Sequence, residues 1–250
     1  MIKTKKIISK KEFVKLNFNA AKKMHKNKSL QKKAKAVLVE ADKHRWVHQS
    51  SWMGEPILNL PQDILTLENI LWKTRPDNII EVGVAWGGGL LFGASLLELY
   101  SGNRVIGIDI FIPDNLKKRL LNKGKISKRI SLIEGSSTDK NTINKLKRII
   151  KNSKNNLIIL DSHHSHDHVL KELEIYTKFV GKGNYIIVGD TIVEDTPAQK
   201  HRLRPWGPGN SPKTAMRKFL KTNKRFEIDK SINEKILITC HPDGYLKAKY

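Results

Sequence analysis

The stretch "IIEVGVAWGGGLLFGASLLELY", residues 79–100, joins a short apolar run to an amphipathic segment through a cluster of glycines. A short apolar run bounded by glycine is typical of a strand, and the segment after the glycines has helical spacing. Glycine at such a turn lets the backbone adopt positive φ and lets a ligand approach without meeting a Cβ atom. The stretch therefore predicts a strand, a turn and a helix, with a ligand held at the turn.

Further apolar runs follow this stretch, and segments of about 10 to 15 residues with helical spacing separate them. The runs lie at residues 79–82, 104–110, 130–133, 157–160 and 184–188. Their alternation with helices predicts βαβ units, and hence an α/β fold with a largely parallel sheet covered on both faces. Near the end, "RFEID" and "KILITC", residues 225–229 and 235–240, are close enough to form an antiparallel pair that closes the sheet after a helix near 212–223.

The first 45 residues read as a basic, largely helical extension before a main domain at residues 46–250. Apolar residues at spacings of three or four predict two helical stretches within residues 10–42, which we expect to pack on the main domain. A linker rich in Trp and Gly follows, and then a helix from Asp63 to about Thr74 that a proline stops. The length of 250 residues suits one such domain better than two equal ones.

Positive charge is concentrated in this extension. Residues 1–45 hold 15 Lys or Arg against 3 Asp or Glu, which gives +12 of the +23 formal charge of the whole chain. Such a block fits non-specific binding to nucleic acid or to an anionic membrane surface. The simpler interpretation, which we prefer, is a solvated and partly helical lead-in. Nucleic acid is not the expected partner, because no zinc-finger spacing or RNP motif accompanies the lysines, while peripheral contact with the inner membrane surface stays open.

The composition indicates a soluble protein of the cytoplasm. Hydrophobic residues make up 39% of the chain, and no apolar run approaches the ~20 residues that cross a bilayer. The basic start lacks the apolar core of a secretory signal. With one cysteine, Cys240, no internal disulfide can form, which suits a reducing compartment.

Four glycines, at 83 and 87–89, occupy the predicted turn, and Asp109 ends the next strand ~20 residues further on, where a carboxylate commonly takes a ribose diol. These features indicate a nucleoside-containing cofactor. The Gly-x-Gly-x-x-Gly fingerprint of a pyrophosphate site is absent, which argues against a nicotinamide-dependent oxidoreductase. Glu81 would repel a pyrophosphate but suits the sulfonium and amino groups of S-adenosylmethionine, the preferred cofactor. The alternative is that the glycines only permit close helix packing.

Two further strand ends carry aspartates, Asp161 in "LIILDSHHSHDHVLKELEIY" and Asp190 in "YIIVGDTIVED". Carboxylates from neighbouring parallel strands converge at one edge of the sheet, and such hard oxygen ligands suit Mg²⁺ or Mn²⁺. The histidines after Asp161 lack the Cys/His spacing of a structural zinc site, and as a set they suit one general base. They are His163, His164, His166 and His168. The alternative role for both aspartates is helix N-capping.

These motifs, in this order, resemble those of the cephalosporin hydroxylase family, which includes rhamnosyl O-methyltransferases and is similar in fold to class I S-adenosylmethionine methyltransferases. The likeness runs from about Trp46 to the C-terminus and leaves residues 1–45 largely outside. It rests on "WMGEPILNLPQD", "PDNIIEVGVAWGGG", "GIDIFI", "IEGSS", "LDSHHSHDHVLKELEIY", "GDTIVED", "RPWGPGNSPKTA", "RFEIDKSINEKILIT" and "PDGYL". The resemblance implies a Rossmann-like sheet of seven strands with an antiparallel last strand, and a homo-oligomer.

The resemblance also implies methyl transfer from S-adenosylmethionine to a sugar hydroxyl in a surface polysaccharide, a glycolipid or a nucleotide-sugar precursor. The residues that it assigns to the cofactor are Glu81, Gly83, Ala85, Gly87, Gly88, Asp109, Glu134, Gly135, Ser136 and Asp161. The rival interpretation is a methyltransferase or a non-enzymatic module that binds RNA or another polyanion through the basic extension.

Similarity to catechol O-methyltransferase extends to a metal site. Asp161 and Asp190 fall on two of that enzyme's metal carboxylates, and Thr191 falls on the third, amide, ligand. His164 falls on its basic residue. The resemblance therefore makes His164 the general base beside Asp161, with His166 in reserve.

The sequence departs from the family at two points. Relatives of the antibiotic-pathway branch carry Glu-Asp where this chain has Gly189 and Asp190, so one metal ligand of that branch is absent here. Many relatives read His-Gly-Gly-Ser in the glycine turn, where this chain has Trp86 followed by three glycines. Any polar role of the His and Ser of those relatives, which correspond to Trp86 and Gly89 here, is lost or moved to other residues.

The segment "HRLRPWGPGNSP", residues 201–212, is too rich in Pro and Gly for regular structure. We expect a lid, in which Trp206 stacks on a sugar and Arg202 and Arg204 meet phosphate. The alternative is an ordered surface connection. "WMGEP", which begins at Trp52, is expected to form a second wall of the same substrate pocket.

Overall fold

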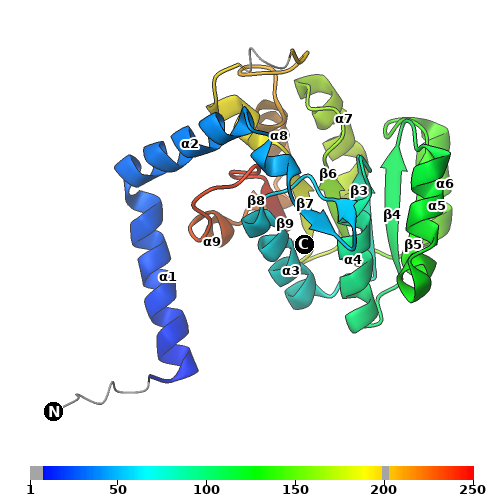
Figure 1. Cartoon of the computed structure of the whole chain (residues 1–250), viewed down its shortest axis with the longest axis horizontal. Helices are drawn as coiled ribbons and strands as arrows, with labels where there is room; N and C mark the ends of the chain where they lie inside the picture. The colour runs from blue at the N-terminus through cyan, green and yellow to red at the C-terminus, as the bar shows by residue number, and fades with distance from the viewer. Residues whose placement is uncertain (1–7, 199–202) are drawn as a thin grey trace.

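The computed structural model describes residues 8–198 and 203–250, and a seven-stranded sheet forms the centre of the molecule (Figure 1). The strands lie in the order β5-β4-β3-β6-β7-β9-β8. Their bounds are β3 (Asn78–Val82), β4 (Arg104–Asp109), β5 (Ile130–Glu134), β6 (Asn156–Leu160), β7 (Tyr185–Val188), β8 (Phe226–Ile228) and β9 (Tyr245–Ala248). Strands β3 to β7 pair in parallel, and β9 runs antiparallel to both β7 and β8. The expected class, an α/β sheet of seven strands with an antiparallel end, is confirmed.

Alternating side chains of the strands form two cores, one on each face of the sheet. Ile80 and Val82 face one core, whereas Ile79 faces the other, as the two-residue period of a strand requires. Helices α6 (Lys140–Ile150), α7 (His166–Tyr176) and α8 (Pro212–Thr222) pack on the first face, and α3 (Pro61–Thr74), α4 (Gly88–Leu99) and α5 (Asp114–Leu121) pack on the second. The result is the three-layer arrangement of repeated βαβ units.

Shorter elements connect these layers. They are β1 (Ser51–Trp52), β2 (Glu55–Pro56), α9 (Lys230–Asn233) and the 3-10 segments η1 (Trp46–His48), η2 (Gly124–Arg129), η3 (Thr177–Phe179) and η4 (Thr191–Asp195). The prediction of a strand in "KILITC" is wrong, because β9 takes that place in the sheet. The N–H groups of Ile238 and Cys240 donate to side chains of Gln62 and Asp63, at 3.4 and 2.9 Å. This segment is therefore tied to the start of α3 and not to a neighbouring strand.

The basic extension forms two helices, α1 (Lys10–Lys26) and α2 (Lys28–Asp42), which meet at Asn27. Helix α2 packs on the body through the buried Ala34 and Leu38, whereas α1 has no buried residue and projects away from the body (Figure 1). The expectation that both helical stretches pack on the main domain is right for α2 and wrong for α1. Within the described ranges, no helix is both long enough and apolar enough to cross a membrane.

The order of the strands reverses at β3. Strands β4 and β5 lie on one side of it and β6 and β7 on the other, so the crevice at the carboxyl ends of β3 and β6 is the switch point of the sheet. Asp109 ends β4, Asp161 directly follows β6, and Asp190 follows β7 after one glycine. Glu81 lies one residue before the end of β3. The fold thus gathers these acidic residues at one edge of the sheet.

The ends of β3 and β6 approach each other closely at Gly83. The φ angle of Gly83 is +100°, and a Cβ atom there would lie 2.2 Å from the backbone oxygen of Asp161. Both the left-handed backbone and the lack of space therefore require glycine. The N–H of Asp161 donates to the carbonyl oxygen of Val82 at 2.8 Å, which holds the two strand ends together.

We predict that Gly83→Ala destabilises the protein by at least ~3 kcal/mol, because the added methyl group meets backbone atoms that cannot rotate away. Gly183→Ala is the matched control: its φ is +82°, but nothing lies within 4 Å of the added Cβ atom, so only backbone strain of ~1–2 kcal/mol remains. Chemical denaturation of the wild type and both variants measures the difference. Equal losses for the two variants would show that the close approach at Gly83 does not limit stability.

Candidate functional site

A cavity of about 560 Å³ opens at the carboxyl ends of the central strands, a size typical of small-molecule sites. Its walls come from the turn after β3, from the strand ends of β6 and β7, from α2 and from residues 56–59. The sequence-predicted site residues that line it are Glu81, Gly83, Ala85, Gly88, Asp161, His164, Asp190, Arg204 and Trp206. The fold thus brings part of the expected cofactor site, the two aspartates and part of the expected lid to one place.

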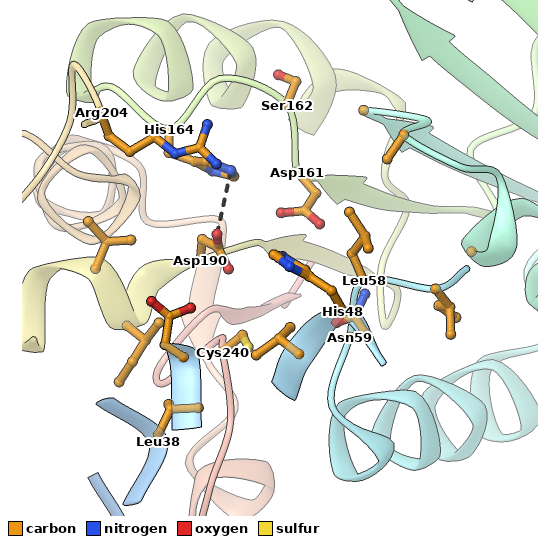
Figure 2. Close-up of a pocket in the computed structure, with 18 of the residues that line it drawn as sticks. Leu38, His48, Leu58, Asn59, Asp161, Ser162, His164, Asp190, Arg204 and Cys240 are labelled. Atoms are coloured by element: carbon orange, nitrogen blue, oxygen red, sulfur yellow. Dashed lines mark ion pairs between the residues drawn. The ribbon is translucent and has the colours of Figure 1, made fainter. Parts of the chain in front are cut away.

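Asp161, His164 and Asp190 face one another in this cavity (Figure 2). One ligand atom from each lies within 4.8 Å of the others, and Nε2 of His164 is 3.6 Å from Oδ2 of Asp190. Burial, with the nearby carboxylates of Asp190 and Glu81, raises the pKa of Asp161 well above its usual range. Burial lowers the pKa of His164, so its imidazole is neutral at pH 7. The cavity therefore holds carboxyl oxygens and a neutral nitrogen side by side.

The carboxylates of Asp161 and Asp190 fit a divalent cation, and the neutral imidazole of His164 lies beside them. Carboxylate oxygens suit Mg²⁺ or Mn²⁺, and a cation would offset the repulsion that raises the pKa of Asp161. Gly189 supplies the room, because a Cβ atom there would lie 2.2 Å from Oδ1 of Asp161. The residue at which this chain departs from the antibiotic-pathway relatives therefore makes space for the Asp161 carboxylate.

Thr191 and His166 point elsewhere. Asp190 adopts a φ of +48°, and the chain then turns into η4, which buries Thr191 with its hydroxyl donating to the carbonyl oxygen of Pro242 at 2.7 Å. His166 opens α7, and its Nδ1 lies 2.7 Å from a threonine hydroxyl of α8. Thr191, the expected third metal ligand, therefore does not face the aspartates, and His164, the expected general base, lies beside them.

Two residues without a recognisable sequence signal hold Asp190 in place. The N–H of Asp190 donates to Nδ1 of His241 at 3.0 Å, and Nε2 of His241 lies 3.0 Å from Oδ1 of Asn59. The His241 imidazole therefore carries its proton on Nε2 and donates it to Asn59. His241 and Asn59 come from distant segments that neither periodicity nor spacing connects, so only the fold reveals this link.

Glu81 lies against the first turn of α4, where a Cβ atom at Gly89 would lie 2.2 Å from its Oε1. Burial raises the pKa of Glu81 to about 8, so the carboxyl group is largely protonated at pH 7. Desolvation is the cause, and no cationic side chain in the described part of the chain offsets it. A cofactor that carries an amino or sulfonium cation therefore fits this position.

Two glycines of the turn are required by close packing, whereas the residue at its tip is open to the cavity. Cβ atoms at Gly87 and Gly88 would lie 2.7 Å from a leucine of α5 and 2.3 Å from the backbone oxygen of Pro56. The alternative explanation, close packing of the helix, therefore accounts for these two positions. Ala85 has a φ of +46° and forms the exposed tip of the turn, so the backbone there is open to the cavity.

The remaining predicted cofactor residues lie beyond the turn, at the ends of β4 and β5. Oδ2 of Asp109 accepts a hydrogen bond from the N–H of Val84 at 2.8 Å, which ties the end of β4 to the turn. Glu134 pairs with a lysine of α5 at 3.0 Å. Gly135 and Ser136 follow it, and the N–H of Gly135 donates to the carbonyl oxygen of Asp109 at 2.8 Å. These four residues form one group that continues from the turn along the sheet edge.

The described part of the expected lid, residues 203–212, packs on the histidines. The ring centroid of Trp206 lies 5.0 Å from that of His163 and 5.1 Å from that of His164, and the Arg204 guanidinium lies 5.3 Å from the Trp206 ring. Arg204 and Trp206 of this segment line the cavity. Arg202, which we expected to act with Arg204, lies outside the described residues.

Trp52 packs on α4 and not on the cavity. Its indole N–H donates to the hydroxyl of Ser95 at 3.1 Å, and its ring lies edge-on to Phe92 at 5.0 Å. The wall expected there is formed by residues 56–59, by Leu38, Val39 and Asp42 of α2, and by Lys43, which follows that helix. The apolar periodicity of α2 was visible in the sequence, but not the surface on which it packs.

A doubly wound sheet of this strand order, with a glycine turn after its central strand and acidic residues at the neighbouring strand ends, defines a class I S-adenosylmethionine-dependent methyltransferase fold. The family model described as Rhamnosyl O-methyltransferase/CmcI matches residues 44–249. The chain belongs to this family, and with it to the S-adenosylmethionine-dependent O-methyltransferases.

Curated relatives and solved structures agree with this assignment. The chain is 26% identical to the Rhamnosyl O-methyltransferase of Mycobacterium bovis over 180 residues, which cover 68% of this chain and 69% of the relative. The Mycobacterium leprae protein of the same name is 26% identical over 162 residues, which cover 62% of this chain and 68% of that protein. The apo structure of CmcI superposes with a TM-score of 0.57 at 19% identity over 81% of this chain and 77% of that one. The structure of CmcI with Mg and SAM also superposes with a TM-score of 0.57, at 20% identity over 81% of this chain and 78% of that one. At these identities the solved structures show the shared fold.

We predict that Glu81→Gln stabilises the cofactor-free protein at about pH 8.5 and leaves it unchanged near pH 4.5. The Glu81 carboxyl binds its proton more tightly folded than unfolded, so stability falls as the pH rises from 4.5 to about 8 and then levels off. Glutamine has no charge to desolvate, and we expect a gain of roughly 2 kcal/mol, or several degrees in Tm, after discounting for partial exposure.

Thermal unfolding across this pH range measures the effect, with the exposed Glu174→Gln as the control. A difference between Glu81→Gln and the wild type that does not change with pH would show that Glu81 ionises normally.

Proposed function

We propose that this protein transfers the methyl group of S-adenosylmethionine to a hydroxyl of a sugar in a surface polysaccharide, a glycolipid or a nucleotide-sugar precursor, with the help of a divalent metal ion. One observation carries the proposal: the glycine turn with Glu81 shares a cavity with the group Asp161, His164 and Asp190. The name of the curated relatives, rhamnosyl O-methyltransferase, supports a sugar as the acceptor.

The turn after β3 would hold the cofactor, whose sulfonium supplies an electrophilic methyl group. Glu81 would take the amino group, because a carboxyl with a raised pKa gains most from a cationic partner. Asp109 at the end of β4 would hold the ribose hydroxyls. Ile110 and Phe111 follow Asp109 and are 75% and 68% exposed. They would offer an apolar surface to the adenine base of the cofactor.

His164 would accept the proton of the acceptor hydroxyl. The sugar oxygen forms a bond to the methyl carbon while the bond from that carbon to sulfur breaks, and the hydroxyl proton passes to the imidazole. The lowered pKa of His164 keeps this base unprotonated at pH 7, and a positioned base contributes about 10²–10⁴-fold to the rate. Of the four histidines at 163–168, His164 is the one placed on the cavity wall.

Asp161 and Asp190 would hold the metal ion, which when bound supplies positive charge beside the reacting oxygen. The link from Asn59 through His241 to the backbone of Asp190 fixes the strand end that carries this carboxylate. Gly189 keeps the space around the Asp161 carboxylate open. The carboxylates of Asp161 and Asp190 would therefore be held in position before any ligand binds, which lowers the reorganisation needed during the reaction.

Arg204 and Trp206 would contact the sugar. Both line the cavity, and the Trp206 ring is braced edge-on against the rings of His163 and His164. A side chain fixed in this way can align the acceptor hydroxyl with the proton acceptor, and alignment alone can supply several kcal/mol.

Calorimetric titration with S-adenosylmethionine, with and without Mg²⁺, tests the cofactor. We expect micromolar binding that Asp109→Ala weakens at least tenfold, because a carboxylate that holds the ribose is lost. No binding under either condition would contradict the proposal.

A deuterated methyl donor and p-nitrophenyl rhamnoside as a probe acceptor test the reaction by mass spectrometry. We predict transfer of one methyl group, a rate reduced about 10²- to 10⁴-fold by His164→Gln at unchanged cofactor affinity, and no change with the remote control His25→Gln. If His164→Gln kept the wild-type rate, the assignment of the base would be wrong.

A further inference from the structure

Helix α1 is amphipathic, and nothing in the described residues covers its apolar face. The helix has 17 residues and buries none of them, and Phe13, Val14 and Leu16 are 56%, 57% and 58% exposed. At 100° per residue, Phe13 and Leu16 share one face with Ala20 and Met24. A helix of this length without tertiary packing is marginal in water. A surface that accepts the apolar face would therefore stabilise the helix.

The opposite face of α1 is basic, with Lys11, Lys15, Lys22 and Lys26. The first turn of α1 holds one acidic residue, Glu12, which is engaged in the capping box with Ser9. Helix α2 continues the positive charge with four exposed lysines, Lys28, Lys32, Lys33 and Lys35. An apolar face beside a lysine-rich face is the pattern of helices that lie in the interface of an anionic bilayer.

Helices α1 and α2 together are called the arm. The arm reaches the active-site cavity through α2. Ala34 and Leu38 anchor α2 on the body, and Leu38 with Lys43 lines the cavity itself. A second cavity of about 460 Å³ lies along α2, and several residues between 233 and 243 form its other wall. Leu38 and Ile192 line both cavities. Its lining combines isoleucines with lysines of α2. An amphiphilic molecule that follows α2 would therefore meet apolar and cationic groups on its way to the active site.

We propose that the arm docks this protein on an anionic lipid bilayer, with the apolar face of α1 in the headgroup region and the lysines against the lipid phosphates. Charge complementarity selects this partner, since residues 1–45 carry a formal charge of +12. A second copy of the chain would bring two like-charged arms together. A nucleic acid would satisfy the lysines but leave Phe13, Val14 and Leu16 in water.

Docking would bring the cavity mouth beside α2 close to the membrane surface. This arrangement selects a sugar carried on an anionic lipid as the acceptor, a consequence that rests on the proposed function. The docking itself does not depend on methyl transfer, so the two can fail separately.

Flotation of the full-length protein with vesicles tests the docking. We expect binding to vesicles of phosphatidylglycerol and phosphatidylcholine, and at least tenfold weaker binding to pure phosphatidylcholine. Replacing Lys11, Lys15 and Lys26 by Gln is expected to lower the partition coefficient on the order of 100-fold. The matched control replaces the exposed Lys140, Lys145 and Lys147 of α6 by Gln and is expected to leave the partition coefficient unchanged within twofold.

The apolar face is tested separately. Phe13→Ser combined with Leu16→Ser is expected to weaken vesicle binding at least tenfold, whereas Leu65→Ser, 61% exposed on α3, changes it less than twofold. Calorimetric binding of S-adenosylmethionine is expected to be the same for all these variants, which separates docking from the proposed function.

Three results would overturn the docking proposal. The first is no vesicle binding by the wild-type protein. The second is equal retention on vesicles and on a polyanion such as poly(U) RNA, unaffected by Phe13→Ser and Leu16→Ser, which would make the arm a nucleic-acid contact. The third is self-association in light scattering that these two substitutions abolish while vesicle binding persists, which would make the apolar face a contact between copies of the chain.

Discussion

Burial of carboxyl groups at one edge of the sheet is the constraint on which the site depends. Glu81, Asp161 and Asp190 surround a single cavity, and burial raises the pKa of the first two. Within the described residues, no lysine or arginine forms an ion pair with any of the three. Such an arrangement costs stability until a cationic partner binds, so it favours a cationic cofactor such as S-adenosylmethionine.

Close backbone contacts make this arrangement possible. Gly83 lets the end of β3 approach Asp161, and Gly189 leaves space for the Asp161 carboxylate. The loops around the site are also tied to one another: hydroxyls of Ser137 and Ser162, which follow β5 and β6, donate to the same oxygen of the buried Glu172, at 2.6 and 2.8 Å. The loop after β5 and the loop after β6 are therefore linked through the Glu172 carboxylate.

The sequence predicted the features that follow from chain order and periodicity. Alternating apolar runs and helices specify a parallel sheet, and in such a sheet strand-end residues such as Asp161 and Asp190 must meet at one edge. The role of the next residue cannot be read in this way, because the positive φ of Asp190 turns Thr191 inward. The helical phase of α7 likewise places His166 against α8 and leaves His164, before the helix begins, in the cavity.

Long-range contacts explain most of the other differences. The segment "KILITC" has the composition of a strand, but Gln62 and Asp63 take its backbone N–H groups and β9 closes the sheet. The contribution of α2 to the cavity and the hydrogen bonds of His241 with Asn59 and Asp190 also depend on residues far apart in the chain. No local pattern specifies which surface such segments contact.

The central claim is that Glu81 is protonated in the free protein and ionises against a cationic cofactor. The most direct measurement is the number of protons released when S-adenosylmethionine binds, from calorimetry at pH 7 in two buffers of different ionisation enthalpy. With a pKa of about 8 for Glu81, we predict release of roughly half to one proton by the wild type and none by Glu81→Gln. Binding by the wild type without proton release would contradict the claim, because it would show that the carboxylate was already charged.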